Sequence, residues 1–183
     1  PYNPLEPVVC IDEKPVQLLD HKRAPVPQAI NGPIKKVDYE YKRCGTANVF
    51  CAIEPKAGVH VTKVTERRTR ADFAEVIEDI EKCYPLANKI HLVLDNLNTH
   101  NEKSLIERFG NEKGSQIWNR FDVHYTPKHA SWLNQAEIEI GMYSKMCLGK
   151  SRIPNKEELT RRTFLWNQYA NSEKMKIHWK FTL

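Results

Sequence analysis

Two patterns of hydrophobic residues alternate along this chain, short apolar runs and stretches with helical spacing. The runs at residues 7–12 (Pro-Val-Val-Cys-Ile-Asp) and 89–95 (Lys-Ile-His-Leu-Val-Leu-Asp) both close on an aspartate. Continuous apolar runs of this length are typical of central strands that are buried on both faces. We therefore expect Asp12 and Asp95 to emerge near the ends of two strands, where they can meet if those strands are neighbours.

Three further segments have the composition of strands. Residues 46–53 and 59–64 are rich in β-branched side chains and flank a turn that contains proline and glycine, which predicts a hairpin. Residues 121–125 form another strand, which Pro127 ends. Between the first strand and the hairpin, residues 19–43 become polar and contain several prolines, so we expect a long excursion or an irregular hairpin there.

Apolar residues with a helical period separate these strands. In the first such stretch, Phe73, Val76, Ile77 and Ile80 would share one face of a helix. Similar spacing and capping signals, including Asn155 as a cap, predict helices over residues 70–83, 101–109, 112–119, 132–148 and 155–167. Strands followed by alternating strands and helices predict an α/β fold, with a mixed sheet flanked by helices on both faces.

The composition is that of an ordinary globular protein. The 183 residues are 40% hydrophobic and 28% charged, which is enough to bury one core and predicts a single domain over residues 1–183. The formal net charge is +5, and basic residues recur at 63–70 and 145–162. This charge permits a polyanionic partner, although solvated helix faces explain such runs at least as well.

Cysteine usage and hydropathy indicate the compartment. The five cysteines never form a Cys-x-x-Cys pair, which favours free thiols in a reducing cytoplasm over disulfides or a zinc site. No apolar run approaches the roughly 20 residues of a membrane helix, and the first residues lack a signal-peptide pattern. We expect a soluble, intracellular protein without a membrane partner. Because the sequence begins with Pro1, we also expect a fragment of something longer.

Three acidic residues would form a metal site if the fold united them. Cleavage of a phosphodiester by two metal ions requires carboxylates that clamp hard cations about 3.5–4 Å apart, and Asp12, Asp95 and Glu137 would supply such a clamp. The two aspartates close apolar runs, where an unpaired carboxylate is costly unless a cation compensates its charge. For any one acid, a polar residue at the boundary of a strand is the commoner explanation.

Three segments around these acids resemble the acidic motifs of mariner-related bacterial insertion-sequence transposases, which belong to the DDE superfamily. They are Ile-Asp-Glu at 11–13, Leu-Asp-Asn-Leu-Asn-Thr-His at 94–100 and Pro-Lys-His-Ala-Ser-Trp-Leu-Asn-Gln-Ala-Glu at 127–137. The resemblance spans nearly the whole chain, and the third segment is its most specific part. It implies a ribonuclease H-like catalytic domain in which Asp12, Asp95 and Glu137 bind two Mg²⁺ or Mn²⁺ ions.

Two neighbouring acids compete with the assigned ones. Glu13 should point to the sheet face opposite Asp12, where a surface role or a supporting contact is expected. Glu139 and Glu137 both flank an apolar helical stripe, so only the resemblance favours Glu137.

Polar residues near the motifs are candidates for contacts with DNA phosphates, and loop residues with a local hydrogen bond are the alternative. They are His100, Lys128, His129 and Asn134. Trp132 is interpreted as a core anchor at the start of a helix in preference to a platform for base stacking.

The activity that the resemblance implies is hydrolysis at transposon ends, followed by strand transfer into target DNA. The partner is double-stranded DNA, and the location is the bacterial cytoplasm, at the nucleoid. Relatives carry an N-terminal helix-turn-helix region, which this sequence lacks, so specific recognition of the ends is not expected of it. Residues 19–43 occupy the place of a loop that reaches a partner subunit, which predicts weak or DNA-dependent dimerisation.

Two alternatives stay open at this point. The first is a ribonuclease H-like nuclease that acts on branched DNA or on RNA–DNA hybrids. The second is a non-catalytic remnant that binds DNA or a partner, which the three intact acids disfavour.

Overall fold

A five-stranded mixed sheet forms the centre of the computed structural model, which describes residues 2–25, 38–128 and 130–178. The strands are β1 (Val8–His21), β2 (Tyr41–Glu54), β3 (Val59–Thr65), β4 (Ile90–Leu94) and β5 (Phe121–Tyr125). Their order across the sheet is β3-β2-β1-β4-β5. The pairs β1–β2 and β2–β3 are antiparallel, whereas β1–β4 and β4–β5 are parallel. The predicted hairpin and the other three predicted strands, which correspond to β1, β4 and β5, are present.

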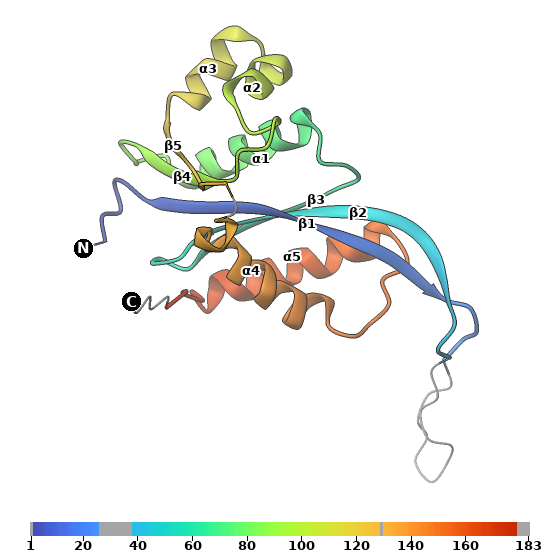
Figure 1. The fold of residues 1–183 in the computed structure, drawn as a ribbon. Coiled ribbons are helices and arrows are strands. Elements are labelled where there is room, and N and C mark those ends of the chain that lie inside the picture. The colour runs from blue at the N-terminus through green and yellow to red at the C-terminus, as the bar shows by residue number, and fades with distance from the viewer. Residues whose placement is uncertain (1, 26–37, 129, 179–183) are drawn as a thin grey trace.

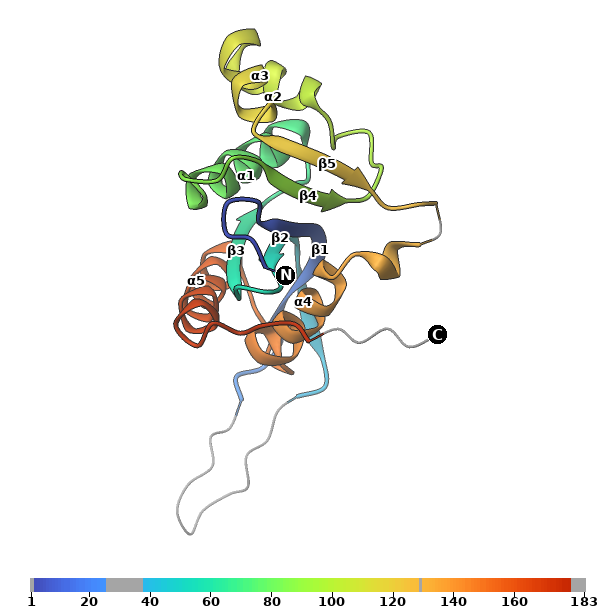
Figure 2. The same ribbon diagram turned by 90° about the vertical axis from the view of Figure 1, so that its left-hand side faces the viewer.

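Helices cover both faces of this sheet, as predicted (Figures 1 and 2). One face carries α1 (Arg70–Cys83), with α2 (Glu102–Phe109) and α3 (Asn111–Trp118) beyond it. The other face carries α4 (Ala136–Tyr143) and α5 (Lys156–Ser172). None of the helices in the described ranges has the length and apolar character needed to cross a membrane.

Helix α1 shows why the predicted boundaries hold where local signals agree. The hydroxyl of Thr69 accepts the backbone N–H of Asp72 at 3.3 Å, and the Asp72 carboxylate accepts the backbone N–H of Thr69 at 2.8 Å, which makes a capping box. The side chains with helical spacing are all fully buried against the sheet: Phe73, Val76, Ile77 and Ile80. The cap fixes the start of the helix, and the apolar stripe fixes its orientation.

Strand β1 is longer than the sequence pattern predicts. It continues to His21, because Val16 and Leu18 are buried on the side of α4 and α5. The expectation that Asp12 ends the first strand is therefore wrong: Asp12 lies within β1 and pairs with Cys51 of β2.

Both ends of the predicted excursion at residues 19–43 belong to the long β1–β2 ribbon. Its centre, residues 26–37, lies outside the described residues. Arg152 holds the ribbon where it leaves the sheet. Its guanidinium donates to the backbone carbonyls of Asp38 and Glu40 at 2.5 and 2.8 Å, and lies 2.9 Å from Nδ1 of His21. One side chain thus ties the two strands of the ribbon to the segment before α5.

The segment predicted as one helix over residues 132–148 is divided into three pieces. A 3₁₀ turn at Ser131–Leu133 precedes α4, and a π-helical turn at Ser144–Leu148 follows it. Asn134 has an extended backbone (φ −76°, ψ 110°), which separates the first turn from α4. The interpretation of Trp132 as a core anchor is wrong, because this side chain is 54% exposed.

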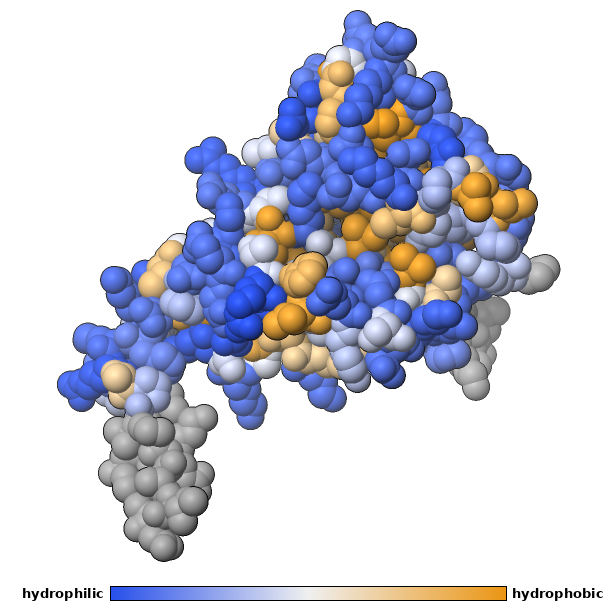
Figure 3. Space-filling model, turned by 180° about the vertical axis from the view of Figure 1, so that it is seen from behind, coloured by the Kyte–Doolittle hydropathy of each residue, from blue (hydrophilic) through white to orange (hydrophobic). Residues whose placement is uncertain are grey.

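Helix α5 begins after Asn155, as predicted, and the Asn155 carboxamide accepts the backbone N–H of Glu158 at 2.8 Å. The helix ends at Ser172, beyond the predicted Asn167. Its outer face exposes three large apolar side chains, those of Phe164, Leu165 and Tyr169. Seen from behind, the surface is largely hydrophilic, with several apolar patches across the middle of the body (Figure 3).

Candidate active site

Asp12 and Asp95 come from neighbouring parallel strands. The register of β1 and β4 pairs Cys10 with Val93, so the residues two positions further on put the two carboxylates side by side on the same face of the sheet. Cys10 packs against Ala136, so this is the face that α4 covers. The sequence predicted that the two aspartates meet if their strands are neighbours. The strands are neighbours, although Asp12 lies within its strand and not at its end.

Glu137 is placed by the start of α4. Nδ2 of Asn134 donates to the backbone carbonyl of Ile11 at 2.8 Å, and Oδ1 of Asn134 accepts the backbone N–H of Ala136 at 3.1 Å. These two buried hydrogen bonds fix the first turn of α4 against β1, next to Asp12. The Glu137 side chain follows directly and is exposed.

The charges around Asp12 are predominantly negative. The pKa of its carboxyl is raised to about 6, chiefly by burial and also by the neighbouring carboxylates of Glu13, Asp95 and Glu137, while a hydrogen bond from the Glu13 backbone lowers it. That hydrogen bond, from Glu13 N–H to Oδ1 of Asp12, is 2.7 Å long. A partly buried acid among three other acids is a charge arrangement that divalent cations stabilise.

The three acids offer only carboxylate oxygens as ligands, and the charges of Asp95 and Glu137 both act on Asp12. Carboxylate oxygens are also the donors that Mg²⁺ and Mn²⁺ prefer, so this donor set fits those ions.

His100 connects Glu13 with the loop after β4. Its Nε2 lies 2.8 Å from Oε1 of Glu13, and its Nδ1 lies 2.7 Å from Oδ1 of Asp95 and 3.2 Å from the Asp95 backbone carbonyl. The ring also stacks on Phe73 of α1, with 4.5 Å between ring centroids. Only a doubly protonated imidazole donates from both nitrogens to acceptors on both sides.

The pKa of His100 agrees with that state. Burial opposes the charged ring, but the hydrogen bond and charge of Glu13, together with the charge of Asp95, outweigh burial and raise the pKa above its usual value. Since the side chain is only 2% exposed, the ring orients Asp95 and has no surface to offer DNA. Glu13 lies on the α1 face, opposite Asp12, and its side chain is only 4% exposed, which favours the expected supporting contact over a surface role.

Glu139 has a different environment from Glu137. Its side chain is fully buried and lies 2.7 Å from Nδ1 of His60 on β3, whose Nε2 lies 2.9 Å from the backbone carbonyl of Met175. The pair therefore joins α4 to the sheet and to the segment after α5. The sequence offers no signal for it, because the two residues are 79 positions apart.

The remaining residues predicted to contact DNA differ in exposure. Lys128 is exposed and lines a groove of about 500 Å³ together with Asp95, so a cation and a site acid share one hollow. Asn134 is 2% exposed, and its carboxamide is used within the protein, which favours the local hydrogen-bond alternative. His129 lies outside the described residues.

Comparison with solved structures defines the fold. The Mos1 mariner paired end complex with Mn superimposes with a TM-score of 0.60 and 14% identity, over 93% of this chain and 51% of that chain. The Mos1 transposase paired-end complex with left transposon end gives a TM-score of 0.57 and 13% identity, over 93% of this chain and 52% of that chain. The fold is thus ribonuclease H-like, similar to the Mos1 catalytic domain. The chain spans about half the length of these Mos1 chains.

Sequence comparison defines the family. The family model described as DDE superfamily endonuclease matches residues 7–160, which include Asp12, Asp95 and Glu137. The chain belongs to this family. No curated protein matches the chain significantly.

Proposed function

We propose that this chain is the catalytic domain of a DDE transposase of the mariner-related type found in bacterial insertion sequences. Its activity would be the cleavage of DNA at transposon ends and strand transfer into target DNA. The observation that supports the proposal is the β1–β4 register, in which Asp12 and Asp95 are neighbours on the face that α4, the helix of Glu137, covers. Membership in the DDE superfamily endonuclease family supports it.

In the proposed reaction, Asp12, Asp95 and Glu137 hold two Mg²⁺ or Mn²⁺ ions. When bound, such ions make a water or a 3′-hydroxyl more acidic and stabilise the negative charge on the leaving oxygen. Burial and the surrounding acids disfavour the ionised form of Asp12, so its proton must leave before it can bind a cation.

Other side chains keep these acids in place. His100 fixes the loop that carries Asp95, and Asn134 fixes the turn that carries Glu137. Lys128, at the rim of the same groove as Asp95, is placed to contact a DNA phosphate. No side chain of the site has to form a covalent bond to DNA in this reaction.

The proposed partner is double-stranded DNA, first the transposon ends and then the target. The net charge of +5 favours binding to this polyanion. Solved Mos1 complexes carry paired transposon ends, which supports a DNA-dependent homodimer of this chain as part of the proposal. The cytoplasm of a bacterium, at the nucleoid, is the corresponding location.

A calorimetric titration of Mn²⁺ tests the site independently of DNA recognition. We expect Asp95→Asn to lose Mn²⁺ binding, whereas Asp20→Asn, a matched change on the outer part of β1, keeps it. Circular dichroism establishes that both variants are folded. Retained binding in Asp95→Asn, or equal loss in both variants, contradicts the proposed site.

A cleavage assay separates the proposal from the ribonuclease H alternative. Supercoiled plasmid and an RNA–DNA hybrid are each incubated with the chain and Mn²⁺. Nicking of the plasmid that Asp95→Asn abolishes supports a DNA endonuclease of the transposase type. Cleavage of the hybrid alone favours the other nuclease.

A further inference from the structure

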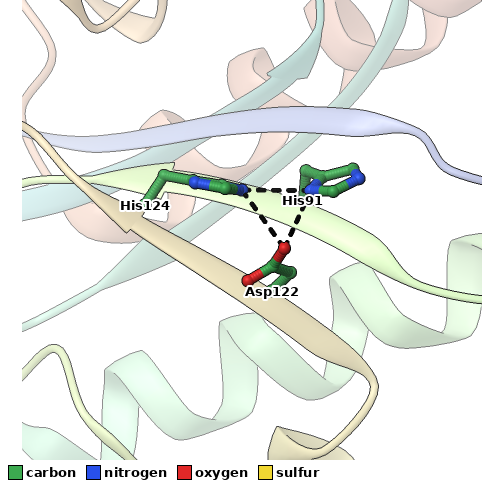
Figure 4. A group of neighbouring side chains, drawn as sticks. All are labelled: His91, Asp122 and His124. Atoms are coloured by element: carbon green, nitrogen blue, oxygen red, sulfur yellow. Dashed lines mark hydrogen bonds and ion pairs between the residues drawn. The ribbon is translucent and has the colours of Figure 1, made fainter.

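Three metal-ligating side chains converge on the outer strands of the sheet, away from the proposed catalytic acids. In the parallel register of β4 and β5, His91 is paired with Asp122, and His124 follows two positions later on the same face of β5. Ile90, Leu92 and Leu94 of β4 are buried on the opposite face. Figure 4 shows the two imidazoles and the carboxylate pointing toward one another across the strands.

The ligand atoms are spaced as a tetrahedral ion would need them. Nδ1 of His91 lies 3.0 Å from Nε2 of His124 and 3.4 Å from Oδ2 of Asp122, and the third distance, Nε2 of His124 to Oδ2 of Asp122, is 3.7 Å. Zinc is bound at about 2.0–2.1 Å by imidazole nitrogen and carboxylate oxygen, so tetrahedral ligands lie about 3.3 Å apart. A single ion can therefore reach all three atoms without a change of backbone.

Hydrogen bonding within the cluster leaves the carboxylate without a close partner. The two imidazoles share one hydrogen bond at 3.0 Å, but Oδ2 of Asp122 is 3.4 and 3.7 Å from the ring nitrogens, beyond normal hydrogen-bond lengths. In the part of the chain that the structure describes, Asp122 forms no ion pair with a lysine or arginine. A cation at the centre would satisfy all three groups at once.

The chemistry of the donors selects the class of ion. Two imidazoles and one carboxylate suit Zn²⁺ and similar transition metals, whereas Mg²⁺ prefers a site of oxygen atoms only. The side chains of His91, Asp122 and His124 are 31%, 55% and 50% exposed, so a fourth position remains open to water or to another ligand. Three protein ligands with an open position are a common zinc arrangement.

The cluster is separate from the carboxylates of the proposed active site. His91 of β4 precedes Asp95, the residue after the end of that strand, by four positions, a separation of about 13 Å at the rise of a β-strand. An ion bound by this cluster would link β4 to β5, which is the edge strand of the sheet.

From these observations we propose that His91, Asp122 and His124 form a binding site for one Zn²⁺ ion that cross-links β4 and β5. The proposal rests on these side chains alone, so it stands or falls independently of the transposase function. A bound ion stabilises the native state, because the unfolded chain does not hold the three ligands together.

The test is a titration of Zn²⁺, in the presence of excess Mg²⁺, into the chain and into three variants. All four proteins are prepared without an affinity tag. We expect one ion per chain, loss of at least about tenfold in affinity in His91→Ala and His124→Ala, and unchanged binding in His178→Ala, an exposed histidine outside the cluster. Co²⁺ in place of Zn²⁺ should give the visible absorption bands of a tetrahedral site only where His91 and His124 are intact. Circular dichroism checks that each variant is folded.

A fourth variant distinguishes this site from the proposed catalytic acids. Asp12→Asn should leave Zn²⁺ binding and the rise in melting temperature on Zn²⁺ addition unchanged, while His124→Ala should lose both. Absence of Zn²⁺ binding, or binding that survives both histidine substitutions, overturns the proposal. Zn²⁺ binding lost in Asp12→Asn but retained in His124→Ala would instead assign the ion to the carboxylates.

Discussion

Nε2 of His100 lies 2.8 Å from Oε1 of Glu13, although the two residues are 87 positions apart in the sequence. The same ring reaches Asp95 through its other nitrogen. Glu13 adjoins Asp12 on β1, so one buried imidazole joins the strand of the first site acid to the loop of the second. The geometry of the two aspartates thus depends on a residue that itself has no access to DNA.

Glu13→Gln removes the charge that holds His100 and should lower the free energy of unfolding by about 1–3 kcal/mol. It should also weaken Mn²⁺ binding, since Asp95 loses its fixed neighbour. Urea denaturation and calorimetry measure the two effects. Glu6→Gln, at an exposed acid near the N-terminus, serves as the control and should change neither. Unaltered stability in Glu13→Gln would show that His100 is held by other contacts.

The raised pKa of Asp12 predicts a pH dependence of stability in the absence of metal. The pKa is about 6 in the native state against 3.8 for a free aspartate side chain, so between these values the native state binds more protons than the unfolded state. Stability therefore falls as the pH rises from about 4 to 6. The full shift corresponds to about 3 kcal/mol, which partial exposure to solvent reduces to about 1–2 kcal/mol.

Asp12→Asn should remove this pH dependence and raise the free energy of unfolding at pH 7 by about 1–2 kcal/mol. The measurement is the difference in urea denaturation between wild type and variant across pH 4 to 7 with EDTA. Addition of Mn²⁺ at pH 7 should stabilise the wild type and not the variant. A difference that is constant with pH would mean that Asp12 does not titrate in this range.

Two glutamates on one helix, two residues apart, should give opposite phenotypes. Glu139→Ala leaves Nδ1 of His60 buried without an acceptor and should lower the free energy of unfolding by about 3 kcal/mol. Glu137→Ala changes an exposed side chain and should alter stability by about 0.5 kcal/mol or less, while Mn²⁺ binding is lost. Thermal denaturation and calorimetry separate the two. A folded Glu137→Ala with normal Mn²⁺ affinity would exclude it from the site.

Trp132 is exposed in the turn that precedes α4, which favours its alternative interpretation as a platform for a base. Trp132→Ala should weaken binding to a fluorescent duplex with a single-stranded end by about 1–3 kcal/mol, the range of base stacking on an aromatic ring. Trp132→Phe should retain most of the affinity. Equal affinity in the alanine variant would leave Trp132 without a role in DNA binding.

The sequence was sufficient to predict the bounds of those helices and strands that follow a single hydrophobic pattern. The apolar stripe of α1 predicted both of its ends, and the apolar runs of β4 and β5 predicted their positions within a residue. The likeness of two runs that close on an acid indicated that Asp12 and Asp95 could meet if their strands were neighbours, and the register of β1 and β4 makes them neighbours. In these elements the local preference of the residues and their burial in the core favour the same secondary structure.

Long-range contacts explain what the sequence did not reveal. The polar residues after Asp12 concealed the continuation of β1, which pairing with β2 stabilises up to His21. Asn134 interrupts the predicted helix because its side chain bonds to β1, a partner more than 100 residues away. The His60–Glu139 pair and the cluster at His91 likewise depend on strands and helices that only the fold brings together.

Strand β1 joins the antiparallel part of the sheet to its parallel part, and this position affects the order of folding. Its pairing with β2 joins segments that are close in sequence, whereas its pairing with β4 joins residues more than 80 positions apart. Closing the larger loop costs more entropy before any contact compensates for it, so the distant pairing forms late. Asp12 and Asp95 become neighbours only in that step. Uptake of an ion by these two acids would therefore mark the completion of folding, after the pairing of β1 with β2 has already formed.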